Sequence, residues 1–184
     1  MSLGQSLFSA CLLVHSLVLM LRYLKPSNIL FNRQGQIKIC DFGEAASIAA
    51  CADSSLAQSG GGSLAYMAPE RLAAQAHGPA ADIWSIGVVL LEMAQGRFPF
   101  QSTEPAGSCS SFSDQDCSMI ELWETIMDET TFPPVLDETR YSAGLTGLIS
   151  ACLQRNPELR PRIDDLLTSK LLDHRANSFE LLFE

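Results

Sequence analysis

The sequence of this 184-residue chain reads KPSNIL over residues 25–30, and thirteen residues after Asn28 it reads DFG over residues 41–43. Between these stretches, the alternating residues Gln36–Cys40 predict a short strand that is entered by a turn at Asn32–Gly35. Either motif by itself is short enough to occur by chance. Their order and separation are informative, and further motifs continue the series downstream.

Three more stretches follow in order: YMAPE at residues 66–70, DIWSIG at residues 82–87, and Arg160-Pro161. The whole series resembles the C-terminal lobe of eukaryotic protein kinases, over about residues 3–172. This resemblance implies an α+β protein-kinase-like fold, C-lobe only. Such a lobe is mainly α-helical, with short β pieces around the catalytic loop and the Asp-Phe-Gly segment.

The resemblance divides the chain into a partial kinase domain at residues 1–172 and a C-terminal tail at residues 173–184. Within the domain, it implies an activation segment at about residues 41–70. An insert loop is expected at about residues 101–117, where Ser, Pro, Gly and Cys replace apolar residues.

Hydrophobic periodicity predicts helices at Leu3–Val14, Ala81–Gln95, Ser118–Met127, Ser142–Leu153 and Ile163–Leu172. For the second of these helices, Asp82 is the predicted N-cap and Gly96 the C-terminal stop. The stretch Ala45–Gly62 is rich in Ala, Ser and Gly and has no stable period, so we expect it to be irregular and mobile.

The composition is that of a soluble globular protein, with 47% hydrophobic and 18% charged residues. A net charge of −9 argues against a nucleic-acid or anionic-membrane surface, which would need clustered Lys and Arg.

The apolar stretch Leu7–Leu21 contains polar residues and is short for a membrane span, so a buried helix is favoured over a cleaved signal. The six cysteines form no Cys-x-x-Cys pair, which favours free thiols in a reducing compartment over three disulfides.

The chemistry of the family suggests roles for three polar residues. Phosphoryl transfer consists mainly of positioning and of charge neutralisation around Mg²⁺ and ATP. Asn28 and Asp41 match the two metal-binding positions, since amide and carboxylate oxygens suit a hard cation. Lys25 matches the lysine that steadies the transferring phosphate. The resemblance therefore implies Mg²⁺ and ATP as cofactors, held by Lys25, Asn28 and Asp41.

Other matching residues are structural. Glu70 and Arg160 match a buried ion pair that ties the activation segment to the lobe. Asp82 matches the aspartate that caps the central helix and also holds the backbone of the catalytic loop. Arg22 matches an arginine that pairs with a phosphate on the activation segment in kinases that require phosphorylation there. The simpler reading of Arg22 is an arginine that is exposed or has a purely structural partner.

Two stretches, YMAPERL at residues 66–72 and IKICDFG at residues 37–43, look like the MAP-kinase kinases. Counted back from Tyr66, Ser55 and Ser59 lie where that subfamily carries its activating phosphoserines. The spacing by itself fits two solvated loop serines equally well. The resemblance implies a cytoplasmic enzyme of a MAP-kinase cascade, with an upstream kinase or a downstream MAP kinase as partner, and no nucleic-acid or membrane partner.

One departure from the family pattern concerns catalysis. Where kinases read His-Arg-Asp, this chain reads Leu21-Arg22-Tyr23, and the distance from His15 to Lys25 matches the family without a gap. Tyr23 therefore stands at the position of the catalytic aspartate. A tyrosine has a pKa of about 10, so at neutral pH it cannot accept the proton of a substrate hydroxyl.

The second departure is the absence from this sequence of a Gly-rich loop and of a Val-Ala-Ile-Lys strand. We therefore expect the ATP-gripping N-terminal lobe to be missing and nucleotide binding to be weak or absent. Three hypotheses remain open: a MAP-kinase kinase represented here by a fragment or incomplete gene model, a pseudokinase-like interaction module without catalysis, and a decayed copy without a stable fold.

Overall fold

The computed structural model describes residues 19–22, 24–33, 37–43, 45–47, 64–100, 122–128, 136–137 and 139–168. Tyr23, Ser55 and Ser59 lie outside these residues. The same holds for the predicted helix Leu3–Val14, the insert loop at residues 101–117 and the tail at residues 173–184.

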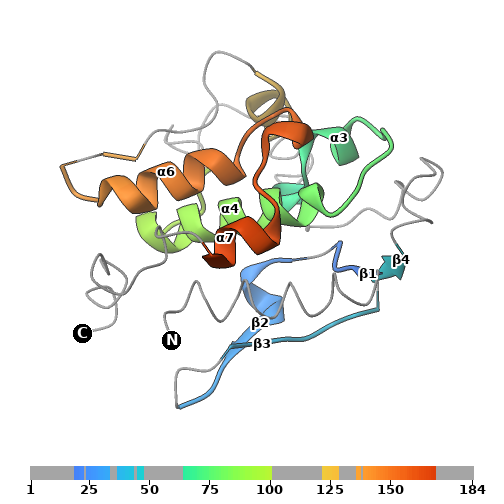
Figure 1. The fold of residues 1–184 in the computed structure, drawn as a ribbon, viewed down its shortest axis with the longest axis horizontal. Coiled ribbons are helices and arrows are strands. Elements are labelled where there is room, and N and C mark those ends of the chain that lie inside the picture. Colours follow the sequence, from blue (N-terminus) through green and yellow to red (C-terminus); the bar gives the residue numbers. More distant parts are fainter. Residues whose placement is uncertain are drawn as a thin grey trace, which may run out of the picture.

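The described residues are mainly helical, with short antiparallel strands (Figure 1). The elements in chain order are β1 (Leu19–Met20), η1 (Pro26–Asn28), β2 (Ile29–Phe31), β3 (Ile37–Ile39), β4 (Ala46–Ser47), η3 (Leu64–Tyr66), α3 (Pro69–Leu72), α4 (Ala80–Gln95), α6 (Ala143–Cys152), η4 (Pro157–Leu159) and α7 (Ile163–Thr168). Residues 122–127 form a further helical segment. This content agrees with a kinase-like fold. Within the described residues, no helix has the length and apolar character that crossing a membrane requires.

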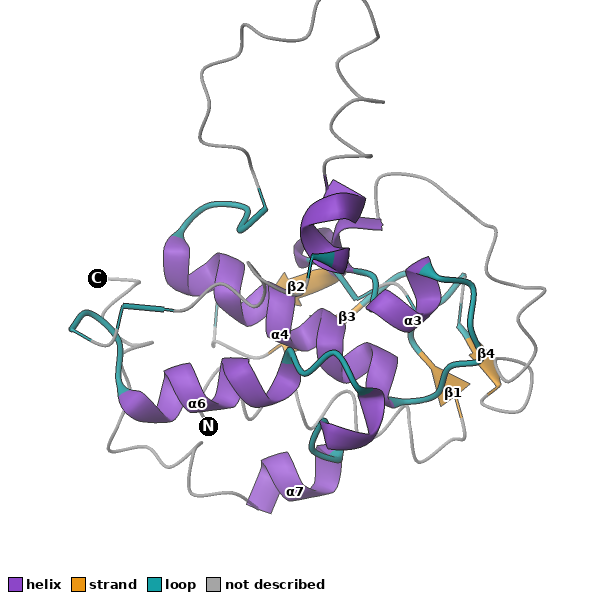
Figure 2. Ribbon diagram, turned by 90° about the horizontal axis from the view of Figure 1, so that it is seen from above, coloured by secondary structure: helices purple, strands orange, loops and turns teal. Residues whose placement is uncertain are grey.

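Helix α4 forms the centre of the hydrophobic core. It is buried almost all round, and Trp84, Ile86 and Val88 are fully inaccessible. A helix that is apolar on every side is stable only when it is surrounded by other elements. Figures 1 and 2 show α6 lying along one side of α4, and α7 packs close by.

The ends of α4 test two predictions about capping. Gly96 is at the C-cap with a φ of 67°, in the left-handed region where glycine carries no Cβ penalty, so the predicted stop is confirmed. The predicted N-cap is wrong, because the N-cap position is Pro79 and Asp82 lies inside the first turn. The carboxylate of Asp82 instead accepts hydrogen bonds from a different part of the chain.

Helix α6 agrees with its prediction to within one residue at each end. Ser142 is the N-cap, and its Oγ accepts a hydrogen bond from the backbone N–H of Leu145 at 3.3 Å. The predicted apolar face is buried, with Leu148, Ile149 and Cys152 each 3% exposed or less. This face packs against α4.

The strands form two separate antiparallel pairs. β2 pairs with β3, with Ile29 opposite Ile39, which confirms the strand predicted within Gln36–Cys40. β1 pairs with β4, with Met20 opposite Ala46. The prediction of an irregular stretch over Ala45–Gly62 is therefore wrong at Ala46–Ser47. Ala46 and Ser47 have little strand propensity of their own, so their strand conformation depends on pairing with β1.

The close packing of α4 on α6 generates a stability prediction at Gly87. A Cβ built on Gly87 would lie 2.8 Å from the Cβ of Cys152 and 2.8 Å from Cδ2 of Leu153. We expect Gly87→Ala to lower the free energy of unfolding by about 1–3 kcal/mol through overpacking, as measured by urea denaturation.

Gly147→Ala is the matched control for this measurement. Gly147 lies in the middle of α6, and a Cβ there would meet nothing within 4 Å. We expect this variant to be neutral or to gain about 0.5–1 kcal/mol, because alanine loses less backbone entropy in a helix. Equal effects of the two substitutions would contradict the packing assigned to Gly87.

Candidate functional site

The β2–β3 pair brings Asn28 and Asp41 together. The backbone N–H of Cys40 donates a hydrogen bond to the carbonyl of Asn28 at 2.9 Å, which extends the strand ladder by one step. On the other side of Asn28, its own N–H donates to the carbonyl of Lys25 at 2.9 Å and closes the η1 turn. The hairpin thereby holds Asn28 and Asp41, which are 13 residues apart in sequence, at the same end.

Asp41 adopts an unusual backbone conformation. Its φ is 63°, in the left-handed region that costs about 1 kcal/mol or more for a residue with a Cβ. The side chain is exposed, and a Cβ built on Gly43 would lie 3.4 Å from Asp41 Oδ1. The hairpin therefore presents the carboxylate at its end, beside a residue that adds no side chain.

The chemistry of Asn28 and Asp41 fits a magnesium ion that also binds phosphate. Oxygen ligands are the ones that Mg²⁺ prefers. Among the described residues, no group of three or more His, Cys, Asp or Glu side chains is placed to hold a metal. A site with one carboxylate and one amide leaves the other coordination positions to water and to the substrate's phosphates, as is usual for Mg²⁺ in phosphoryl-transfer proteins.

Asp82 anchors the segment that precedes Lys25. Its Oδ2 accepts a hydrogen bond from the N–H of Leu21 at 2.9 Å, and its Oδ1 accepts one from the N–H of Arg22 at 3.0 Å. Asp82 is fully buried, and the φ of Arg22 is 63°. Arg22 is therefore the second residue of the site with a left-handed backbone. The carboxylate of Asp82, 60 residues later in the sequence, holds it against the central helix α4.

Glu70 and Arg160 form a bidentate ion pair across 90 residues of sequence. Nη1 of Arg160 donates to Oε1 at 2.6 Å, and Nη2 donates to Oε2 at 2.8 Å. Both side chains are buried. Charge-assisted hydrogen bonds of this fork-to-carboxylate kind are among the strongest and most directional in proteins. The pair ties α3 to the segment after η4.

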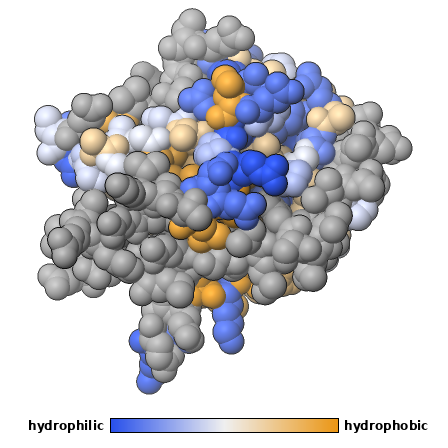
Figure 3. All heavy atoms as spheres, in the orientation of Figure 1, coloured by the Kyte–Doolittle hydropathy of each residue, from blue (hydrophilic) through white to orange (hydrophobic). Residues whose placement is uncertain are grey.

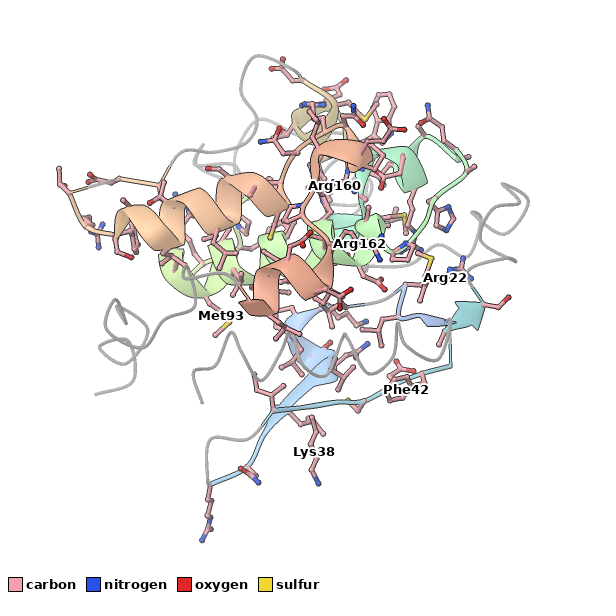
Figure 4. The ribbon with its side chains drawn as sticks, viewed as in Figure 1. Arg22, Lys38, Phe42, Met93, Arg160 and Arg162 are labelled. Atoms are coloured by element: carbon pink, nitrogen blue, oxygen red, sulfur yellow. The ribbon has the colours of Figure 1, made fainter. Side chains whose placement is uncertain are left out.

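Arg160 has four further partners. It donates to the backbone carbonyls of Ala80, Gln154 and Arg155, at 2.9, 2.6 and 3.0 Å. Its guanidinium carbon also lies 5.1 Å from the centre of the Trp84 ring, within cation–π range. Figure 4 shows Arg160 beside the start of α4, and the side chain of Arg162 is exposed.

Tyr66 fixes the segment in front of α3 to α4. Its hydroxyl donates to Glu92 Oε2 at 2.7 Å, and its carbonyl accepts from the hydroxyl of Ser85 at 2.8 Å. The ring also packs edge-on against Phe98. Burial, and then the hydrogen bond and charge of Glu92, raise the pKa of Tyr66 above its usual value. Sequence reasoning used Tyr66 only as a motif position and missed Glu92.

Two further basic residues belong to the surroundings of Arg22, Arg71 through a hydrogen bond and His77 through electrostatic interaction. Nη1 of Arg71 donates a hydrogen bond to the carbonyl of Arg22, and all three side chains are at least nine-tenths buried. Sequence reasoning missed both residues. Arg71 sits next to the recognised Tyr66–Glu70 motif, but its position there does not reveal which backbone it contacts.

The buried ion pair generates a stability prediction. Arg160→Ala removes both hydrogen bonds to Glu70 and leaves its carboxylate buried, so we expect the free energy of unfolding to fall by about 3–5 kcal/mol in urea denaturation. Arg162→Ala is the control, because Arg162 is exposed and its contact with Asp164 is long, with 3.9 Å between Nη2 and Oδ2. That surface pair should contribute less than about 1 kcal/mol. A loss at Arg160 no larger than that at Arg162 would refute the structural role of the ion pair.

The comparisons with known proteins agree with this geometry. The model of the protein kinase domain family matches residues 2–172. Mitogen-activated protein kinase kinase 2 of Arabidopsis thaliana is 37% identical over 152 residues, which cover 83% of this chain and 39% of that protein. The dual specificity mitogen-activated protein kinase kinases dSOR1 of Drosophila melanogaster and mek-1 of Caenorhabditis elegans are 35% and 34% identical. They are covered over 39% and 40% of their lengths.

The chain thus spans about two fifths of the length of these relatives. The family match, in contrast, includes every described element and nearly all of the chain. The chain belongs to the protein kinase family, and the relatives that it resembles are mitogen-activated protein kinase kinases.

Proposed function

We propose that this chain is the C-terminal lobe of a protein similar to the MAP-kinase kinases in which phosphoryl transfer is blocked at residue 23. The observation that carries the proposal is Tyr23 itself, two residues before Lys25 in a register that is otherwise intact. The reaction needs a group that accepts the proton of the attacking hydroxyl. A neutral phenol does not accept it at pH 7, and a tyrosine side chain is bulkier than the aspartate that it replaces.

The remaining residues of the site keep their chemical capacity. Asn28 and Asp41 would hold Mg²⁺, and the ammonium of Lys25 would contact the phosphate. When bound, the ion neutralises the charge of the phosphate oxygens. The hydrogen bonds that the N–H groups of Leu21 and Arg22 donate to Asp82, and the β2–β3 ladder, support this proposal, because they hold both arms of the site. Binding and orientation are thereby separated from proton abstraction.

The names of the relatives suggest the partners of this chain. We assign it to a MAP-kinase cascade, with an upstream kinase or a downstream MAP kinase as partner and the cytoplasm as its location. Arg22 is proposed to pair with a phosphate on Ser59, with Ser55 as the second phosphorylation site. The thiols of Cys40 and Cys152 are free in the structure, which fits a reducing compartment.

The first test measures catalysis and nucleotide binding on the purified chain. With Mg²⁺, radiolabelled ATP and a MAP kinase as acceptor, we expect no phosphate transfer by the wild-type chain. Isothermal titration should give a Kd for Mg-ATP weaker than about 10 μM, which corresponds to about −7 kcal/mol. Asp41→Asn controls for a contaminating kinase. Transfer by the wild-type chain that disappears in Asp41→Asn, or tighter nucleotide binding, would overturn the proposal.

A second candidate function is a pseudokinase-like interaction module, favoured by two exposed apolar side chains at the β2–β3 hairpin. Leu30 is 51% exposed and Phe42 is 49% exposed. Figure 4 shows Phe42 close to the hairpin, and in Figure 3 apolar side chains reach the surface in several small areas between hydrophilic ones. Apolar side chains of this size at a sheet mark a surface that another chain or domain can cover.

The module hypothesis predicts association through this hairpin. We expect the wild-type chain to self-associate in sedimentation velocity experiments at micromolar concentration, and the double variant Leu30→Ser/Phe42→Ser to shift toward monomer. Trp123→Ser removes an equally exposed apolar side chain from the helical segment 122–127 and should not have this effect. A monodisperse wild-type monomer with a sharp two-state melt would count against the hypothesis.

A further inference from the structure

Three basic side chains gather where the segment before Lys25 meets α3. Arg22, Arg71 and His77 are 7%, 4% and 8% exposed. The guanidinium of Arg71 is hydrogen-bonded to the carbonyl of Arg22, and His77 lies within electrostatic reach of both arginines and of Glu70. Figure 4 shows Arg22 at the edge of α3, beside the β1–β4 pair.

The hydrogen bonds of His77 determine where its proton lies. Nδ1 is 3.1 Å from the carbonyl oxygen of Gln75. Because a carbonyl only accepts, this bond places the proton of the neutral imidazole on Nδ1 and leaves Nε2 as an acceptor. Nε2 is buried and has no hydrogen-bond partner within the part of the chain that the structure describes. A buried polar atom without a partner costs about 1–3 kcal/mol, which calls for an explanation.

Burial and the surrounding charges together lower the pKa of His77. Burial lowers its pKa most, the bond to Gln75 raises it, Arg71 and Arg22 lower it, and Glu70 raises it. The carboxylate of Glu70 is already held by both terminal nitrogens of Arg160. The fully buried carboxylate of Asp82 is engaged by the backbone of Leu21 and Arg22. An anion that binds near His77 would raise the pKa of His77, because negative charge stabilises the protonated imidazole.

We propose that His77 completes a proton-coupled phosphate site with Arg22 and Arg71. In this site, a phosphomonoester that binds at the two arginines draws a proton onto Nε2, which then donates a hydrogen bond to a phosphate oxygen. The proposal rests on the phosphate-pairing role given to Arg22 above. It adds Arg71 and His77 to that site and makes its affinity depend on pH.

A phosphomonoester fits this cluster better than a carboxylate does. It carries nearly two negative charges at neutral pH and three acceptor oxygens, which match two guanidinium groups and one imidazolium. Its second pKa is about 6, so it stays largely dianionic down to the range where His77 would gain its proton. Affinity therefore rises as the pH falls from 8 toward 6.5, by at most about tenfold per pH unit for a single coupled proton.

O-phospho-L-serine is the probe for the experiment, with L-serine as its control. The pKa of His77 is measured by NMR from its Cε1–H resonance in the full chain, with and without an excess of the probe. His77→Gln identifies the resonance among those of His15, His77 and His174. We expect phosphoserine to raise the pKa of His77 by about one unit, and serine to leave it unchanged.

Linkage gives a second, independent measurement. Phosphoserine should bind His77→Gln about two- to fivefold more weakly than wild type at pH 6.5 and equally well at pH 8.5, because the same coupling acts on both partners and His77 is only partly protonated at pH 6.5. An unchanged pKa of His77 with phosphoserine bound would overturn the proposal. The wild-type titration decides the question even where the variant fails to fold.

Arg22→Gln separates the failure of this inference from the failure of the function proposed for Arg22. Binding that is lost in Arg22→Gln and leaves the pKa of His77 unmoved in the wild type would defeat the proton coupling only. Binding that is equal in wild type and Arg22→Gln would defeat the phosphate-pairing role of Arg22, and the present proposal with it. Neither result bears on the proposed block of phosphoryl transfer at Tyr23.

Discussion

The ion pair between Arg160 and Glu70 joins the parts of this molecule that are most distant in sequence. Its two short hydrogen bonds hold α3, while the other nitrogen contacts of Arg160 hold the start of α4 and the turn around Gln154. Burying two charges is costly, and the cost is recovered only where every donor finds an acceptor. Arg160 meets that condition through carboxylate and carbonyl oxygens. The segment from Tyr66 to Leu72 is consequently held at one position on the core.

Helix α4 extends this constraint to the candidate site. From one buried helix, Asp82 holds the backbone of Leu21 and Arg22, while Ser85 and Glu92 hold Tyr66. A packed interior is stiff and leaves little room for alternative arrangements. The geometry around the site is therefore fixed largely by the core.

Two of the three described non-glycine residues with a left-handed backbone, Arg22 and Asp41, belong to the segments that carry the candidate site. The third, Ala74, lies just after α3. Such conformations persist only where surrounding contacts hold them, here the carboxylate of Asp82 and the β2–β3 ladder. The buried Nε2 of His77 is a further cost in the same region. These costs are typical of a surface shaped for a ligand.

The sequence by itself determined the family and the two longest described helices. Periodicity located α4 and α6 to within one residue, and Gly96 marked the end of α4, because a helix depends on neighbours three and four residues away. The family resemblance related Glu70 to Arg160, a pair that the structure contains. The resemblance also implied that Asp82 holds the backbone of the catalytic loop, and in the structure its carboxylate accepts hydrogen bonds from the N–H groups of Leu21 and Arg22. Only the tertiary structure decided that Ala46–Ser47 forms a strand, that Arg71 contacts the backbone of Arg22, and that His77 lies within electrostatic reach of both arginines. These contacts join residues up to about 60 positions apart in sequence, and such residues come together only when the hydrophobic core packs.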